Sequence, residues 1–148
     1  MEKANFSVKK KKGKLKVECM SKELIISIII VILIFIGNHL TEKYTQICVS
    51  ETNQNLSELR EEISKDEVDL QSAKNKADET YNKWNGWHQK LAFYIEHNEL
   101  EKINTQLTGV KGYIEQEEYA EAIPELDKGM YILQHIKDKN AVNLKNIF

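Results

Sequence analysis

A single uninterrupted apolar run is the strongest pattern in the chain. It extends from Leu24 to Gly37 and carries no charged side chain. A bilayer core about 30 Å thick needs roughly 17 to 25 helical residues, and the snorkelling side chain of Lys22 together with Leu40 extends the run to about 17. We therefore predict a transmembrane helix over residues 24–40. No small-x-small cleavage site follows it, which favours an uncleaved signal anchor over a cleaved signal peptide.

Heptad spacing dominates the chain beyond the run. Apolar side chains recur every seven residues from Leu56 to Leu91, and a second seam position extends from Leu59 to Tyr94. This pattern predicts a long coiled-coil-like helix. The first series is Leu56, Ile63, Leu70, Ala77, Trp84 and Leu91, and the second is Leu59, Ala73, Trp87 and Tyr94, with Asp66 and Thr80 as polar exceptions.

Two shorter stripes complete the helical pattern. One extends from Leu100 to Ile114 and the other from Tyr119 to Ile136, with the polar link 115–118 between them. A link this short makes the two helices antiparallel neighbours, and Pro124 predicts a kink or a late start in the second. The predicted fold is all-α, with an N-terminal transmembrane helix, a long coiled-coil-like helix and an antiparallel helical hairpin that form a helical bundle.

The predicted helix lengths do not match one another. If Thr52–His97 is one helix, it is roughly 70 Å long, whereas hairpin helices of about 17 to 20 residues cover only about 25 to 30 Å of it. Either the helix folds back near Lys65 and Asp66, or another chain covers the remainder. The second alternative gives a candidate protein-interaction seam, through which the chain associates with itself or with a partner. Its residues are Leu56, Leu59, Ile63, Leu70 and Ala73.

Charge is distributed unevenly about the apolar run. Residues 1–23 hold eight lysines and three glutamates, a formal charge of +5, and the remainder holds 13 basic and 20 acidic side chains, −7, which together give the net −2. Positive charge beside a span stays on the cytoplasmic side. We therefore predict a basic cytoplasmic tail over residues 1–23, an extracytoplasmic helical domain over residues 41–148, and a single-pass protein of the cell membrane.

Four aromatic side chains of the heptad region form a candidate aromatic core or ligand patch. Exposed rings of this kind stack on sugars, for example those of a cell wall, whereas buried rings fill the place where helices meet. Their helical spacing favours the core. The four residues are Tyr81, Trp84, Trp87 and Tyr94.

The residue patterns point to no catalytic or metal chemistry. The sequence has no Gly-x-Ser-x-Gly, phosphate-loop or Gly-x-Gly-x-x-Gly motif. His88 and His97 belong to no His-x-x-x-His or Glu-x-x-His pattern, and no aromatic residues interleave the lysine cluster as a nucleic-acid site would require. We predict a protein that is not an enzyme and binds no cofactor, metal or nucleic acid. Cys48 is either a free thiol or a bridge to a second chain.

The stretch from Trp84 to Ile103, WNGWHQKLAFYIEHNELEKI, is followed by the predicted hairpin and the closing Asn146-Ile147-Phe148. This combination resembles domain-of-unknown-function family 4363, which comprises small single-span membrane proteins of Gram-positive, often spore-forming, bacteria. The resemblance implies a membrane-anchored bacterial protein, favours a membrane protein as its partner and supplies no catalytic residues.

Two functions fit these patterns. The leading one is a non-enzymatic membrane-anchored scaffold or accessory protein, whose helical outer domain acts on itself or on another envelope protein. The alternative is an extracytoplasmic ligand or cell-wall binding module that uses the aromatic cluster. Exposure of Trp84 and Trp87 discriminates the two, because buried indoles favour the scaffold and a solvent-lined aromatic groove favours the binding module.

Overall fold

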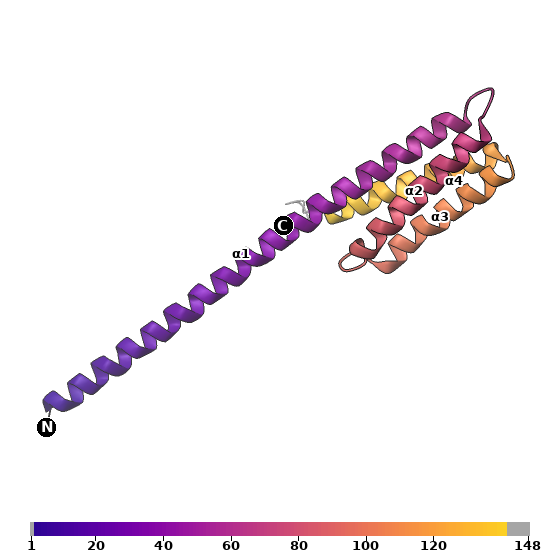
Figure 1. Cartoon of the computed structure of the whole chain (residues 1–148). Coiled ribbons are helices and arrows are strands. Elements are labelled where there is room, and N and C mark those ends of the chain that lie inside the picture. The colour runs from indigo at the N-terminus through magenta and orange to yellow at the C-terminus, as the bar shows by residue number, and fades with distance from the viewer. Residues whose placement is uncertain (1, 142–148) are drawn as a thin grey trace. The chain divides into compact units, whose positions relative to one another are not determined.

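The computed structural model describes residues 2–141, with side chains from Ser21 onward, and over this range the chain forms four helices and no strand (Figure 1). This confirms the all-α prediction. Asn146-Ile147-Phe148, part of the family resemblance, lies outside the described residues. The helices are α1 (Glu2–Ile63), α2 (Leu70–Leu91), α3 (His97–Glu115) and α4 (Tyr119–Asn140).

The chain divides into two compact units, Met1–Leu40 and Thr41–Phe148. The first unit contains the apolar run, and α1 has one stretch, with a mean hydropathy of 2.5, that is long and apolar enough to cross a membrane. The large apolar side chains from Leu24 to Ile36 are between 50% and 68% exposed. No other part of the described chain therefore buries them, as is expected of a helix whose surface faces lipid.

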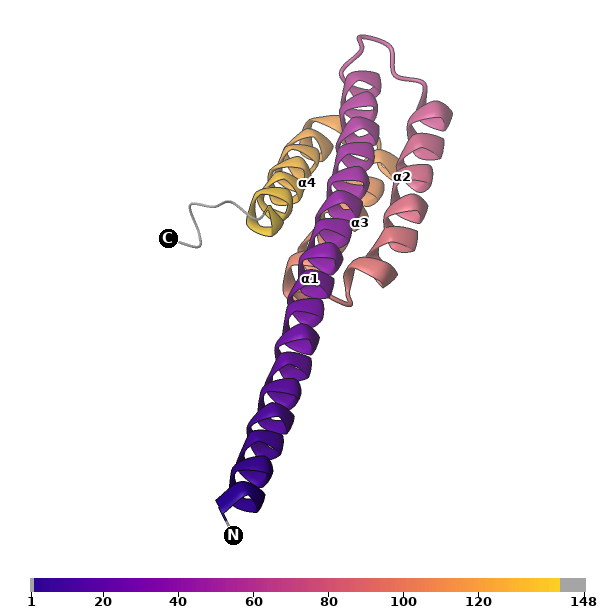
Figure 2. The same ribbon diagram turned by 90° about the vertical axis from the view of Figure 1, so that its left-hand side faces the viewer.

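The second unit is a four-helix bundle of up-down-up-down topology, built from residues 41–63 of α1 together with α2, α3 and α4. In Figure 2, α2 and α4 flank this part of α1 and α3 lies behind it. We call the end that holds Thr41 and the α2–α3 loop the near end, and the end that holds residues 64–69 and 116–118 the far end. Ion pairs join each helix to its neighbours, namely Glu62–Lys76, Lys111–Asp78, Lys139–Glu99 and Arg60–Asp127.

The candidate seam is part of the core of this bundle. Four of its five residues are at most 3% exposed and the fifth is partly buried. The prediction of a seam left uncovered within a single chain is wrong, because α1 ends at Ile63 and the chain folds back. The four buried residues are Leu56, Leu59, Ile63 and Ala73, and the partly buried one is Leu70.

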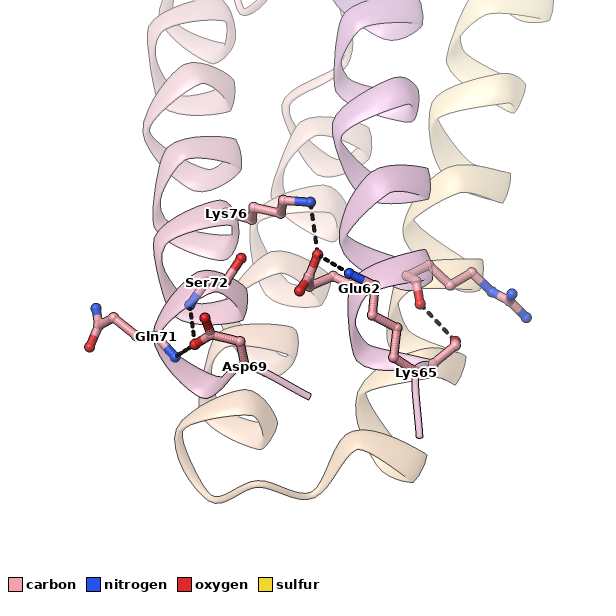
Figure 3. Close-up of polar contacts among 8 residues, drawn as sticks. Glu62, Lys65, Asp69, Gln71, Ser72 and Lys76 are labelled. Carbon is pink, nitrogen blue, oxygen red and sulfur yellow. Dashed lines mark hydrogen bonds and ion pairs between the residues drawn. The ribbon is translucent and has the colours of Figure 1, made fainter. Parts of the chain in front are cut away.

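A side-chain cap starts the returning helix. The carboxylate of Asp69 accepts hydrogen bonds from the backbone N–H groups of Gln71, at 2.9 Å, and Ser72, at 3.1 Å (Figure 3). These groups have no partner inside a helix, and an aspartate at this position stabilises a helix start by typically about 1 kcal/mol. The fold-back alternative is therefore correct, and residues 52–97 are two helices.

Glu62 joins the end of α1 to α2 across the same corner. Its Oε2 accepts hydrogen bonds from Lys65 Nζ, at 2.9 Å, and from Lys76 Nζ, at 3.2 Å (Figure 3). The Glu62 side chain is only 11% exposed. A carboxylate this buried needs both partners to offset the water that it has lost.

This corner predicts a loss of stability in acid. Hydrogen bonds from Lys65 and Lys76 hold the pKa of the Glu62 carboxyl below its ordinary value of 4.5. A lowered folded-state pKa adds stability above the unfolded-state pKa, and that stability is lost as pH falls through the folded-state value.

We expect Glu62→Gln to lower the free energy of unfolding at neutral pH and to flatten its decline in acid. Urea unfolding over a pH series measures both, with exposed Glu61→Gln as control, and an unchanged acid limb would contradict the assignment.

The α3–α4 turn is a Schellman motif with glutamate where glycine is usual. The Glu118 N–H donates to the Tyr113 carbonyl at 2.9 Å, and the Glu117 N–H donates to the Ile114 carbonyl at 3.1 Å. Glu117 has a φ of 60°, which is left-handed backbone that side chains with a Cβ adopt at a cost.

We expect Glu117→Gly to raise the free energy of unfolding by about 1 kcal/mol, because glycine removes that cost. Urea unfolding of the full-length protein in detergent measures the change. Gln116→Gly is the matched control and should not stabilise, since Gln116 has a φ of −93°. Equal effects of the two glycines would show that the turn geometry is not the cause.

Pro124 lies inside α4 and does not delay its start. The helix begins upstream, at Tyr119, with Glu118 in the capping position, and continues to Asn140. The prediction of a late start is therefore wrong. The proline ring takes away the N–H that would bond to the Ala120 carbonyl, and Pro124 is exposed.

Candidate functional site

Trp84 is a core residue and the anchor between α2 and α3. It is 0% exposed, and its indole Nε1 donates a hydrogen bond to Asn104 Oδ1 at 2.7 Å. Its ring meets the His88 ring edge to face, with centroids 6.4 Å apart. The only polar atom of the indole is therefore satisfied inside the protein, and no ring face is left for a ligand.

Tyr81 lies at a shallow cleft between α2 and α3, with a cation over its ring. Lys111 Nζ is 4.8 Å from the ring centroid and also pairs with Asp78 Oδ1 at 2.6 Å. The cleft encloses about 290 Å³, and its other lining residues include Thr108 and Glu115. The lysine therefore occupies one face of the partly buried Tyr81 ring.

Trp87 and Tyr94 pack toward α1 instead of α3. The Trp87 ring, which is partly buried, meets the Tyr44 ring edge to face at 5.7 Å. Lys90 Nζ lies 5.9 Å from the centroid of the same Tyr44 ring. Tyr94 is 37% exposed, and its hydroxyl lies 3.2 Å from Thr45 Oγ1. The four predicted aromatic residues therefore face two different helices, α3 and α1, and do not form one patch.

The aromatic contact with α1 includes two residues that the sequence analysis did not assign to the core. The Tyr44 hydroxyl is buried beside Cys48, and burial, together with the interaction with Cys48, raises the pKa of Tyr44. Cys48 is 0% exposed, and burial raises the pKa of its thiol to about 11. The thiol is thus protonated at neutral pH and, being enclosed by its own bundle, does not reach a second chain.

The spacing of residues in the sequence does indicate this part of the core, which lies on α1 before Leu56. Thr45, Cys48 and Thr52 are each at most 2% exposed, and they continue the three-and-four spacing of Leu56 and Leu59 backward along α1. Each threonine hydroxyl donates to a carbonyl one turn earlier, at 2.9 and 2.8 Å. That internal bond allows a polar residue to occupy a buried position.

The α2–α3 loop closes the near end of the bundle. The Tyr94 hydroxyl lies 3.5 Å from the Thr41 carbonyl, and Ile95, beside it, is 7% exposed. Phe93, one residue earlier, is 89% exposed. The loop therefore has one side chain in the core, one on α1 and one directed away from the protein.

Groups of His, Cys, Asp or Glu with the closeness of a metal site do not occur among the described side chains. The histidine pair of the heptad region, His88 and His97, has ring centroids 5.8 Å apart. His97 Nε2 lies 3.1 Å from Glu101 Oε1. His97 is exposed, and its contact with Glu101 is an ordinary i,i+4 pairing along one helix face.

Comparison with known proteins identifies the family of the chain. No curated protein and no solved structure matches it. A family model described as "Domain of unknown function (DUF4363)" matches residues 36–147. The match begins inside the apolar run and includes every helix of the bundle. The chain belongs to the DUF4363 family.

Proposed function

We propose that this protein is a single-pass membrane protein whose outer bundle acts as a non-enzymatic scaffold or accessory subunit for another envelope protein. One observation carries the proposal. The apolar side chains of the run are at least half exposed, while the bundle that follows directly in the chain has a closed core of its own. An apolar helix of this length needs lipid around it, and the bundle needs nothing further to be folded.

The lysine-rich start supports a cytoplasmic N-terminus. Residues 1–23 carry a formal charge of +5 and the rest of the chain carries −7. A cytoplasmic tail of that charge also lies favourably along the anionic inner leaflet. The bundle is then outside the cell membrane.

A separate partner fits better than self-association through the predicted seam. The seam residues pack inside their own bundle, as Leu56 at 0% and Leu59 at 1% exposure illustrate. Outside the apolar run, the described chain still exposes two large side chains on the sides of the bundle, Ile47 at 44% and Tyr131 at 75%. These are the positions from which a partner is best sought.

The aromatic residues favour the scaffold over the ligand-binding alternative. Trp84 is fully buried, and Lys111 covers the ring of Tyr81. Trp87 is partly buried against Tyr44. A carbohydrate-binding surface requires open ring faces side by side, and these rings face different helices.

Photocrosslinking in native membranes tests the proposal. A photoreactive residue replaces Tyr131 or Ile47, and the same residue at buried Ile63 serves as the internal control. We expect one envelope protein to be captured from an exposed position and nothing from position 63. Capture of the chain itself alone, or no capture from either exposed position, would overturn the accessory role.

Orientation is tested in the same cells with a membrane-impermeant thiol reagent. Tyr131→Cys should be labelled in intact cells, whereas the buried Cys48 gives little background. Labelling of position 131 only after the cells are broken would reverse the proposed orientation without affecting the anchoring itself.

A further inference from the structure

Phe93 is the most exposed large apolar side chain in the described part of the bundle, at 89%. It is not on a loose segment. The Phe93 N–H donates to the Lys90 carbonyl at 3.4 Å, and the N–H groups of Tyr94 and Ile95 donate to the Leu91 carbonyl at 3.1 and 2.9 Å. A turn hydrogen-bonded in this way holds the phenyl ring out in water, from which transfer to an apolar environment is favourable.

The turn is fixed to the residue at which the chain leaves the apolar segment. The Tyr94 hydroxyl contacts the Thr41 carbonyl at 3.5 Å and Thr45 Oγ1 at 3.2 Å. Thr41 is bonded directly to Leu40, so their Cα atoms are only about 3.8 Å apart. The turn that carries Phe93 is thus fixed to the first residues of the bundle, which follow the apolar segment directly in the chain.

We propose that the α2–α3 loop is a lipid-contacting element, in which Phe93 enters the interfacial region of the bilayer while exposed Lys90 and Lys43 face phospholipid headgroups. The inference rests on the proposed membrane anchoring. Aromatic rings and lysines are the side chains that membrane interfaces favour.

A lipid surface fits the loop better than a protein does. Phe93 is the one large apolar side chain of this loop that is mostly exposed, since Ala92 is small, the Tyr94 hydroxyl contacts α1 and Ile95 is buried. A stable protein interface buries about 800 Å² on each partner around a central apolar cluster. A bilayer needs no such cluster, because a single ring can be buried among lipids independently of its neighbours.

The loop also explains how the bundle would be oriented. The far-end loops are acidic, with Asp66, Glu67, Asp69, Glu117 and Glu118 against a single lysine, Lys65. Carboxylates are costly to bring into a bilayer, so that end is unfavourable for lipid contact. A lipid contact at Phe93 therefore holds the near end at the membrane, with the far end directed away from it.

Depth-dependent quenching in vesicles tests the contact. The full-length protein, with Cys19 and Cys48 replaced by serine and alanine, receives one cysteine carrying an environment-sensitive fluorophore, at Phe93, Tyr131 or Ile29. It is reconstituted into phosphatidylcholine–phosphatidylglycerol vesicles that contain nitroxide-labelled lipid. We expect strong quenching and a blue-shifted emission at position 93, and neither at position 131, which is 75% exposed on the side of α4.

Position 29, inside the apolar run, separates the two proposals. Quenching at 29 without quenching at 93 overturns the lipid contact and leaves the anchoring in place. Absence of quenching at 29 overturns the anchoring and, with it, the lipid contact. A blue shift at 93 without quenching means that protein instead of lipid covers the labelled position, which also overturns the lipid contact.

Discussion

Replacing Trp84 with alanine is expected to lower the free energy of unfolding by about 3 to 5 kcal/mol, the range for deleting a buried tryptophan side chain. Trp84 is 0% exposed and lies where α2 and α3 pack against each other. Its removal opens a cavity and also leaves Asn104 Oδ1 without the indole N–H that bonds to it. A domain of this size is stable by only about 5 to 15 kcal/mol, so the variant is close to unfolding.

Two further variants separate packing from hydrogen bonding. Trp84→Phe retains most of the ring contacts but removes the donor to the partly buried Asn104, and should cost about 1 kcal/mol for the lost hydrogen bond plus a smaller packing loss. Trp87→Ala is the matched control, because Trp87 is only partly buried. Urea unfolding in detergent, followed by near-ultraviolet circular dichroism, measures all three. If Trp84→Ala costs no more than Trp87→Ala, the tryptophan is not the central packing residue.

Placing arginine at both Ile28 and Ile32 is expected to release the protein from the membrane. Each charge at the centre of a spanning helix costs roughly 2.5 to 3.5 kcal/mol on insertion scales. Two such charges in a run of only about 17 residues remove most of the insertion energy. Membrane fractionation with carbonate extraction measures the outcome.

Arginine at Gln46 and Gln54, both exposed on the bundle, is the matched control for added charge. This control should stay with the membrane fraction. Retention of the Ile28 and Ile32 double variant after carbonate extraction would mean that the apolar run is not what holds the protein there.

The helical hairpin could be predicted from the sequence almost completely. The stripe from Leu100 to Ile114 lies within α3, and the stripe from Tyr119 to Ile136 lies within α4. Their apolar positions alternate cleanly with charged ones, and the link of acidic residues ends one helix before the next begins. Local periodicity was therefore sufficient here, because each stripe faces a single neighbouring core.

The corner between α1 and α2 could not be predicted from periodicity. The loop of residues 64–69 lies between Ile63 and Leu70, which are one heptad apart, so the apolar repeat passes through it unbroken. Both helices pack their apolar repeat against the same core. The same spacing therefore fits one straight helix and two antiparallel helices equally well. The signals that did mark the corner were polar, namely Asp66 in a seam position and the capping Asp69.

The candidate site was only partly accessible from sequence for a similar reason. Spacing places Tyr81, Trp84, Trp87 and Tyr94 in one region of the sequence. The full burial of Trp84 and the partial burial of Tyr81 and Trp87 favour the core interpretation, whereas Tyr94 is 37% exposed. Helical spacing does not show which helix each ring contacts. Trp87 packs against Tyr44, and Trp84 bonds to Asn104. Both contacts join residues of different helices, so no local pattern predicts them.

The reversal at Ile63 sets how far this protein can reach. Because each helix of the bundle returns along the one before, the described bundle is about as long as residues 41–63 of α1, about 35 Å at 1.5 Å per residue, with the loop of residues 64–69 at its end. In the proposed topology, a partner would therefore offer its binding surface within about that distance of the bilayer. The proposal thus directs the search to proteins that are themselves embedded in the membrane or held against its outer face.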